Sequence, residues 1–363
     1  MSKRVGVVGI GLSKLKGNFG SKALELSGNN FGNMLFTNAV YKQIQSCQHI
    51  GFSLDVDKIK NEIDHIVIPA ANWVNPKEDW GFLADALKKI DLPVCVVGLG
   101  SQLDNLDQTE QIPEGTRRFI RVVSERCSSI GVRGRFTESV LHKLGIKNVT
   151  PLGCPSIFFN TKVPELRTNF PKENIRIGVG PTRYGLPKAS QLKAADKQRQ
   201  LYKFALEYGS SIYYQSEAFE IAFLNREDVT DKYDDAIAYY GAKNSADLSS
   251  KLLAKGKYHK DLDQWLADAI KDDLYIGTRI HGAVAAILSG TPAILITHDN
   301  RTRELADIMG IPSIDISAFS ISMLDDIHGF IKNFNFSEIT TVSRSNIKGF
   351  KDFYSQNGLD CLL

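Results

Sequence analysis

One segment in the last third of the chain carries side chains that can bind an anion and move a proton. Residues 274–290 read LYIGTRIHGAVAAILSG, an apolar run followed by Thr278, Arg279 and His281 and then by small residues. This pattern predicts a strand that runs directly into a helix, with Arg279 and His281 at the junction. Helix N-termini attract anions, the arginine fork suits phosphate or carboxylate, and histidine exchanges a proton near neutral pH. The structural alternative is that Arg279 caps a carbonyl and His281 is a buried core residue.

Other polar or glycine-rich segments also follow apolar, strand-like runs. Ligands of parallel sheets bind at the carboxyl ends of strands, so we expect several of these segments to line one cleft, although each alone could be an ordinary turn. Arg135 is expected to pair with Glu138 on the following helix. The candidate substrate-binding residues are Asn30, Gly32, Asn33, Asn72, Gly100, Ser101, Gln102, Arg133, Gly180, Arg183, Thr278, Asp299 and Arg301.

The order of strand-like and helical segments predicts the fold that positions these residues. Continuous apolar runs alternate with helical patterns, including residues 33–48 and 189–207, which favours parallel sheets covered on both faces. A polar segment with two prolines, residues 160–174, separates two such series. We therefore predict an α/β fold of two Rossmann-like doubly wound domains, residues 1–165 and 172–335, facing across a cleft. Residues 336–363 are expected to form a helical tail that packs back on the first domain.

Composition excludes several classes of protein. The chain has 363 residues and a net charge of +3 with mixed signs, which argues against a nucleic-acid-binding protein. Its five cysteines form no CxxC pair, which argues against a disulfide framework and a zinc site. Without a leader pattern or a long apolar run we expect a cytoplasmic protein, and attachment to the inner face of the membrane stays open. No metal-binding cluster is apparent. Lys14 occupies the third small position of GxGxxG, so the dinucleotide fingerprint fails.

Three segments together resemble the polysaccharide pyruvyl transferase family. The run IGTRIHGAVAAILSGTPAILITHDNRTRELADIMGIPSID is similar to the C-terminal signature of that family. Residues 130–157, IGVRGRFTESVLHKLGIKNVTPLGCPSI, resemble its strand, arginine, helix and Gly-Cys-Pro run, and residues 30–33, NFGN, resemble its Asn-x-Gly-Asp. The chain departs from the family in having Asn33 where an aspartate is common and Ala70-Ala71-Asn72 where a glycine-rich loop is common.

The resemblance implies a glycosyltransferase-B-like pair of domains, with the acceptor on the N-terminal side and the donor on the C-terminal side. It implies transfer from phosphoenolpyruvate to two hydroxyls of one sugar, which forms a pyruvate ketal and releases phosphate, with no metal or other cofactor. In that reaction His281 would protonate the methylene carbon and Arg279 would hold an anionic group, with Arg133 or Arg183 holding the other. The acceptor would belong to a surface polysaccharide or to a lipid- or nucleotide-linked precursor.

Two other functions remain open at this stage. A nucleotide-sugar glycosyltransferase of the same architecture would bind uridine nucleotides and not phosphoenolpyruvate. A non-catalytic sugar- or nucleotide-binding protein would bind its ligand without turnover, and His281→Ala would leave that binding unchanged.

Overall fold

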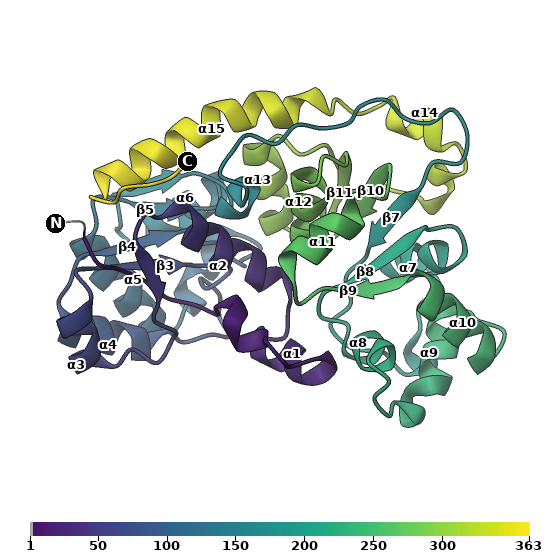
Figure 1. The fold of residues 1–363 in the computed structure, drawn as a ribbon, viewed down its shortest axis with the longest axis horizontal. Helices are drawn as coiled ribbons and strands as arrows, with labels where there is room; N and C mark the ends of the chain where they lie inside the picture. The colour runs from purple at the N-terminus through teal and green to yellow at the C-terminus, as the bar shows by residue number, and fades with distance from the viewer. Residues whose placement is uncertain (1–2) are drawn as a thin grey trace.

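The computed structural model describes residues 3–363 and arranges them as two lobes of parallel β/α units (Figure 1). The sheet of the first lobe has the order β2-β1-β3-β4 and is parallel throughout. A second parallel pair, β5 and β6, continues it through a bridge between Leu99 and Val132. The strands are β1 (Val5–Val7), β2 (Cys47–His49), β3 (His65–Pro69), β4 (Val94–Val97), β5 (Ile130–Val132) and β6 (Val149–Pro151).

Alternating side chains of this sheet face two different layers of helices. Ile66 and Ile68 of β3 belong to one buried cluster with α3, α4, α5 and α6, whereas Val67 points to the opposite cluster with α2. Both faces are buried, which explains why the strands read as continuous apolar runs. The helices of this lobe are α1 (Gly20–Leu26), α2 (Gly32–Gln43), α3 (Val56–Glu62), α4 (Gly81–Ile90), α5 (Glu114–Arg126) and α6 (Arg135–Lys143).

The second lobe is a six-stranded parallel sheet in the order β12-β11-β10-β7-β8-β9. The chain builds outward from β7 through β8 to β9, then returns to the other side of β7 with β10, so the order reverses between β7 and β10. Such a reversal is where ligands of open α/β sheets bind. The strands are β7 (Ile177–Gly180), β8 (Ser211–Tyr214), β9 (Gly256–Tyr258), β10 (Leu274–Gly277), β11 (Ala293–Thr297) and β12 (Ser313–Asp315).

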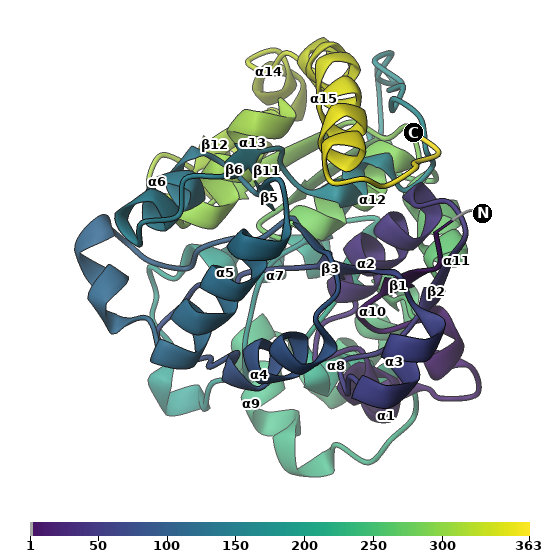
Figure 2. The same cartoon turned by 90° about the vertical axis from the view of Figure 1, so that its left-hand side faces the viewer.

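Helices pack against this second sheet; Figure 2 views the molecule from the side of the first lobe, with the second lobe behind it. They are α7 (Lys197–Glu207), α8 (Ala218–Leu224), α9 (Tyr233–Tyr240), α10 (Ser245–Lys255), α11 (Leu262–Ala269), α12 (Ile280–Leu288), α13 (Asn300–Met309) and α14 (Ile327–Ile331). The predicted fold class, two Rossmann-like doubly wound units across a cleft in the glycosyltransferase-B-like manner, is confirmed. Within residues 3–363, no helix combines the length and the apolar character needed to cross a membrane.

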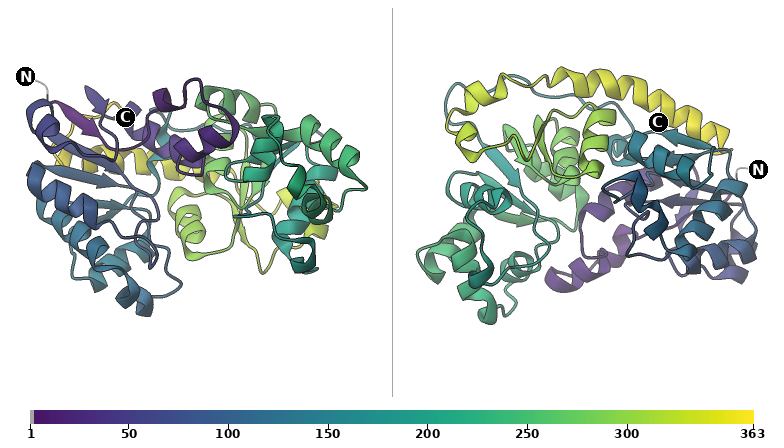
Figure 3. Two further views of the ribbon diagram at one scale, coloured as in Figure 1. Left: turned by 90° about the horizontal axis from the view of Figure 1, so that it is seen from below. Right: turned by 180° about the vertical axis from the view of Figure 1, so that it is seen from behind.

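Two segments tie the lobes together. Helix α1 leaves the first lobe and packs on α8 of the second (Figure 3), and next to it the Phe31 ring stacks on Tyr258 with centroids 5.6 Å apart. The last helix, α15 (Ser337–Gln356), packs on α13 and runs back to the first lobe. There Phe350 meets Phe158 edge-on at 5.4 Å, and the Tyr354 hydroxyl donates to Gln43 Oε1 at 2.8 Å.

Two helix predictions were wrong in extent. The helix expected over residues 33–48 ends at Gln43, because the next residues extend and form the short edge strand β2. The helix expected over residues 189–207 begins at Lys197, where Asp196 caps it by accepting from the Arg199 N–H. In both cases the apolar period was right, but it does not locate helix ends, which capping and edge pairing decide.

Replacing Phe350 tests the contact of α15 with the first lobe. The ring is fully buried, so Phe350→Ala should lower the free energy of unfolding by about 3–5 kcal/mol through lost burial and the cavity left behind. Urea denaturation followed by circular dichroism measures this change. Lys348→Ala, exposed on the same helix, should change it by less than about 0.5 kcal/mol. Equal effects of the two variants would contradict the packing described.

Candidate functional site

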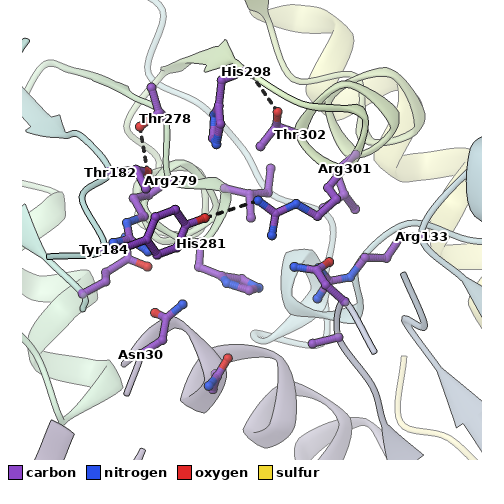
Figure 4. A pocket seen from close by; sticks show the side chains of 16 residues that line it. Asn30, Arg133, Thr182, Tyr184, Thr278, Arg279, His281, His298, Arg301 and Thr302 are labelled. Atoms are coloured by element: carbon purple, nitrogen blue, oxygen red, sulfur yellow. Dashed lines mark hydrogen bonds between the residues drawn. The ribbon is translucent and has the colours of Figure 1, made fainter. Parts of the chain in front are cut away.

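A small cavity of about 130 Å³ lies between the two lobes, where β7 and β10 end (Figure 4). We call it the cleft cavity. The first lobe contributes asparagines and one arginine, and the second contributes two further arginines, two histidines and several hydroxyl groups. Its lining residues are Asn30, Asn33, Ala71, Asn72, Arg133, Thr182, Tyr184, Gln215, Thr278, Arg279, Ile280, His281, His298, Arg301, Thr302 and Leu305.

Arg279 stands at the N-cap of α12 and is held by a buried carboxylate. Its side chain is 9% exposed, and its guanidinium donates to Glu217 Oε1 and to the Ser216 hydroxyl. Burial by itself lowers the pKa of Arg279, but the Glu217 carboxylate outweighs that effect and the net shift is upward. Its Nε has no partner among the described residues. The Arg279 charge is therefore permanent, and most of it is already neutralised.

Glu217 is in turn fixed by main-chain donors. Its Oε2 accepts from the N–H groups of Gln215 at 2.8 Å and Ser216 at 3.0 Å, and its Oε1 accepts from the Tyr202 hydroxyl at 3.0 Å. Burial raises the pKa of Glu217, but Arg279 and these N–H donors lower it by more than burial raises it. The net shift is downward, so the carboxyl stays ionised. The pair is thus built as a rigid unit before any ligand arrives.

Arg183 does not line the cleft cavity. Its guanidinium lies behind the wall, paired with the fully buried Glu220. It faces the rings of Tyr202 and Tyr239, with its central carbon 5.5 and 4.8 Å from their centroids. The structure therefore gives this side chain a place in the core of the second lobe behind the cavity wall, although the Arg183 carbonyl accepts from Arg279 Nη2 at 3.4 Å.

His281 occupies the first turn of α12 in surroundings that disfavour its protonated form. The ring is 7% exposed, stacks on Phe36 with centroids 5.6 Å apart, and has Nε2 3.7 Å from Cys154 Sγ. Burial, together with the neighbouring Arg133 and Arg279, lowers the pKa of His281 to about 3. A Cβ on Gly32 would come within 2.8 Å of His281 Nδ1, so a glycine is needed there. In the free protein His281 is a neutral imidazole.

Arg133 is the arginine of this cavity that no carboxylate neutralises directly. It is 2% exposed; its Nε donates to the Gly98 carbonyl at 3.0 Å and its Nη1 to Asn72 Oδ1 at 2.7 Å. Its Nη2 has no partner among residues 3–363, and burial lowers the pKa of Arg133. Gly100 makes room for it, because a Cβ there would lie 2.7 Å from Arg133 Cδ. This buried charge lacks the partner that such charges normally have.

The first turn of α13 supplies the third arginine. Asp299 caps α13, with Oδ1 accepting from the Thr302 N–H at 2.9 Å, and its Oδ2 pairs with Arg301. Arg301 also reaches the exposed Tyr184, whose hydroxyl lies 3.5 Å from Nη2. His298 beside it has its Nδ1 buried without a partner in the described part of the chain, and burial lowers the pKa of His298.

The remaining sequence-predicted residues divide into lining residues and structural ones. The cleft cavity brings together Asn30, Asn33, Asn72, Arg133, Thr278, Arg279, His281 and Arg301. Ser101 is buried with its hydroxyl on the Val74 carbonyl, and Gly180 faces the Tyr275 hydroxyl, which a Cβ would approach to 2.0 Å. Gln102 and Asp299 line neighbouring cavities. Arg135 pairs with Glu138 at 2.9 Å, as predicted.

Sequence reasoning missed four residues that shape the site. Gln215, Tyr184 and Thr302 line the cavity, and Glu217 holds Arg279. For Gln215 and Glu217 a signal was present, since they directly follow the apolar run SIYY that forms β8. Ligands of parallel sheets bind at the carboxyl ends of strands. The same rule, applied to the end of this run, predicts both residues.

Comparisons with known proteins found one matching family model and several distantly similar solved structures. A family model described as "Polysaccharide pyruvyl transferase" matches residues 30–300. No curated protein matches the sequence. Several solved structures resemble the chain, each at a sequence identity below 12%. They include Staphylococcus aureus MnaA with UDP (TM-score 0.49, 11% identity, 98% of this chain and 97% of that chain covered). A second is a putative UDP-N-acetylglucosamine 2-epimerase from Listeria monocytogenes (TM-score 0.47, 9% identity, 98% of this chain and 98% of that chain covered). A third is Anabaena HepE with UDP and glucose (TM-score 0.45, 10% identity, 98% of this chain and 97% of that chain covered).

Removing the Glu217 charge tests the buried ion pair. Glu217→Gln leaves Arg279 buried without its counter-charge, so the free energy of unfolding should fall by about 3–5 kcal/mol. The matched control is Glu207→Gln, which breaks a surface pair with Lys251 and should cost at most about 1 kcal/mol. Urea denaturation of both variants measures the difference, and a cost for Glu217→Gln no larger than the control would refute the pairing.

The charge state of His281 gives a second test. Its folded-state pKa of about 3 lies below the value of about 6.5 in an unfolded chain. The neutral ring therefore stabilises the fold above pH 6.5, and that contribution is lost as the pH falls toward 3. Nitrogen-15 NMR of the imidazole, assigned with His281→Gln, should show the neutral form down to pH 5. A protonated ring at pH 6 in the free protein would contradict the lowered pKa of His281.

Proposed function

The chain belongs to the polysaccharide pyruvyl transferase family, and we propose that it transfers a pyruvyl group from phosphoenolpyruvate to a sugar. Membership makes it a transferase of polysaccharide modification. The donor, the ketal product and the acceptor, a residue of a surface polysaccharide or its lipid- or nucleotide-linked precursor, are our proposal. The observation that carries it is Arg133, a buried guanidinium without a carboxylate partner, in one small cavity with Arg279 and His281.

The balance of charge in the cleft cavity favours a small, multiply charged anion. Arg279 and Arg301 each have a carboxylate partner, Glu217 and Asp299, whereas Arg133 has none. An anion that reaches the Nη2 of Arg133 would supply the hydrogen bond and the counter-charge that this buried group lacks. Phosphoenolpyruvate carries a phosphate and a carboxylate within three carbons, so it can engage Arg133 and a second arginine at once.

The proposed reaction has a simple balance of bonds and protons. The methylene carbon of the donor gains a proton, two acceptor hydroxyl oxygens bond to its C2, and the C2–O bond to phosphate breaks. One hydroxyl proton replaces the proton given to the methylene, and the other leaves with the phosphate. No metal is required. His281 is the residue we assign to the proton transfer at the methylene carbon, a role typically worth about 10²–10⁴-fold in rate.

The neutral state of His281 makes donor binding part of its activation. Burial, together with Arg133 and Arg279 beside the ring, makes the imidazole resist protonation, so it is a poor acid in the free protein. A bound trianion reverses the sign of the local potential and raises the pKa of the imidazole. The ring would thus become an acid only when the donor is present.

Calorimetry of phosphoenolpyruvate binding tests the donor. Arg133→Gln should weaken binding about 10–100-fold, because a charge-assisted hydrogen bond is worth roughly 1.5–3 kcal/mol. It is a cleaner variant than Arg279→Ala, which would leave Glu217 buried and unpaired. The control Arg135→Gln removes an 82%-exposed side chain and should bind as the wild type does. Binding of uridine nucleotides without phosphoenolpyruvate would replace this function with nucleotide-sugar glycosyl transfer.

The same titration tests the role of His281. Repeating it in buffers of different ionisation enthalpy gives the protons taken up on binding. Uptake should be positive and should grow as the pH falls from 7 to 5, because the donor raises the pKa of His281. His281→Gln should abolish this uptake and turnover while phosphoenolpyruvate still binds. Unchanged uptake in the variant would assign the proton to another group, with His298 the nearest alternative on the cavity wall.

A further inference from the structure

A second, larger cavity of about 370 Å³ adjoins the cleft cavity on the side of the first lobe. We call it the aromatic cavity. The two share four lining residues, Asn30, Asn33, Ala71 and Asn72, so a ligand in one lies against the other. Its size falls within the range of about 300–1,000 Å³ typical of small-molecule sites.

The aromatic cavity lies at the point where the order of the first sheet reverses. In the order β2-β1-β3-β4 the reversal falls between β1 and β3. Ile10, just after β1, and Ala71, just after β3, both line the cavity. Each lobe therefore has a cavity at its own reversal, which is the position where open α/β sheets bind ligands, and the two cavities meet.

One wall of the aromatic cavity is an unusual concentration of aromatic rings. Trp73 and Trp80 stack with centroids 4.0 Å apart and planes at 20°, and Phe52 lies 6.0 and 6.4 Å from them. Trp80 is only half-buried, and its Nε1 has no hydrogen-bond partner among the described residues. Rigid, amphipathic rings of this kind bind ligands that present both apolar faces and hydrogen-bonding groups.

The rest of the lining carries polar groups and no cation. The Glu78 carboxylate is exposed and makes no hydrogen bond or ion pair with residues 3–363. Gln102 also lines the cavity, and Asn33 uses its Nδ2 on the Ser27 carbonyl at 3.1 Å, which leaves its Oδ1 available. Where the cleft cavity attracts anions, this cavity repels them and offers acceptors for hydroxyl donors.

The loop that carries Glu78 and Trp80 is fixed without a ligand. Asn75 Oδ1 accepts from the N–H groups of Lys77 at 2.8 Å and Glu78 at 3.0 Å. Thr116 then bridges the loop, with its hydroxyl donating to the Glu78 carbonyl at 2.9 Å and accepting from the Trp80 N–H at 3.1 Å. Such preorganisation lowers the entropy that a ligand must overcome.

We infer that the aromatic cavity binds one sugar ring of the acceptor. The C–H face of this sugar ring packs on Trp80, and the hydroxyls of the ring form hydrogen bonds with Glu78, Gln102 and Asn33. A pyranose has the required combination of apolar face and dense hydroxyls, and the shared residues Asn33 and Asn72 place two of those hydroxyls toward the donor. The assignment of this ring as the acceptor rests on the proposed function.

Tryptophan fluorescence provides a direct test. The chain has three tryptophans, and Trp265→Phe removes the one that lies in the second lobe, so the remaining signal comes from the aromatic cavity. We would titrate this protein, with phosphoenolpyruvate bound, with the α- and β-methyl glycosides of glucose, galactose, mannose, N-acetylglucosamine and N-acetylmannosamine. Concentrations up to about 100 mM cover millimolar dissociation constants. At least one glycoside should give a saturable change.

Two variants distinguish the cavity from a non-specific effect. Trp80→Ala should weaken glycoside binding about tenfold or more, and Glu78→Gln, at an exposed position that cannot unfold the chain, about fivefold, since each removes one direct contact. Neither should alter phosphoenolpyruvate binding measured by calorimetry. The control is Glu125→Gln, exposed on α5, which should change neither. Glycoside binding that Glu78→Gln and Trp80→Ala leave intact would overturn the inference.

The remaining outcomes separate this inference from the proposed function. If phosphoenolpyruvate binds but no glycoside changes the fluorescence, the donor assignment stands and the sugar site is wrong. If glycosides bind as expected but phosphoenolpyruvate does not, the sugar site stands and the donor assignment fails. Saturable quenching by uridine monophosphate in place of every glycoside would assign the aromatic wall to a nucleotide base and overturn the inference.

Discussion

The burial of arginine charge at the carboxyl ends of parallel strands is the constraint on which the rest of this site depends. Taking a guanidinium out of water costs several kcal/mol unless a counter-charge accompanies it. The second lobe meets this cost with two buried pairs, Arg279 with Glu217 and Arg183 with Glu220. Arg133 has no such partner, only a carbonyl, an amide and an unused Nη2. The fold therefore carries one uncompensated charge, and it faces the cleft.

Burial and the neighbouring arginines together set the state of the histidine. His281 is buried beside Arg133 and Arg279, so its pKa falls to about 3 and the free protein holds a neutral ring. An anion that pairs with Arg133 would offset the part of this depression that the arginines cause, because the same charge acts on both groups. Anion binding at Arg133 and proton uptake by His281 are consequently expected to occur together. The glycine at position 32 leaves room for the ring, and Cys154 Sγ lies 3.7 Å from its Nε2.

The sequence predicted the position of most of these side chains but not their partners. Apolar runs located the strands, and the rule that function gathers at strand ends located Arg133, Arg279 and His281. It also selected Arg183, which the structure places in the core behind the wall. Arg183 and Arg279 both follow a strand and look alike in sequence. Only the three-dimensional packing of α8 decides that Glu220 pairs with Arg183 and Glu217 with Arg279. Short edge strands such as β2 were missed because three residues carry no measurable period.

The contact between the lobes holds two of the arginines in register. Glu304 of α13 accepts from the Thr137 N–H at 3.1 Å and from its hydroxyl at 2.7 Å, so a carboxylate of the second lobe caps helix α6 of the first. Helix α6 begins two residues after Arg133, and α13 begins one residue before Arg301. Gly134 permits the approach, because a Cβ there would lie 2.7 Å from Glu304. The cap therefore fixes the relative position of the segments that bring Arg133 and Arg301 from different lobes to one cavity.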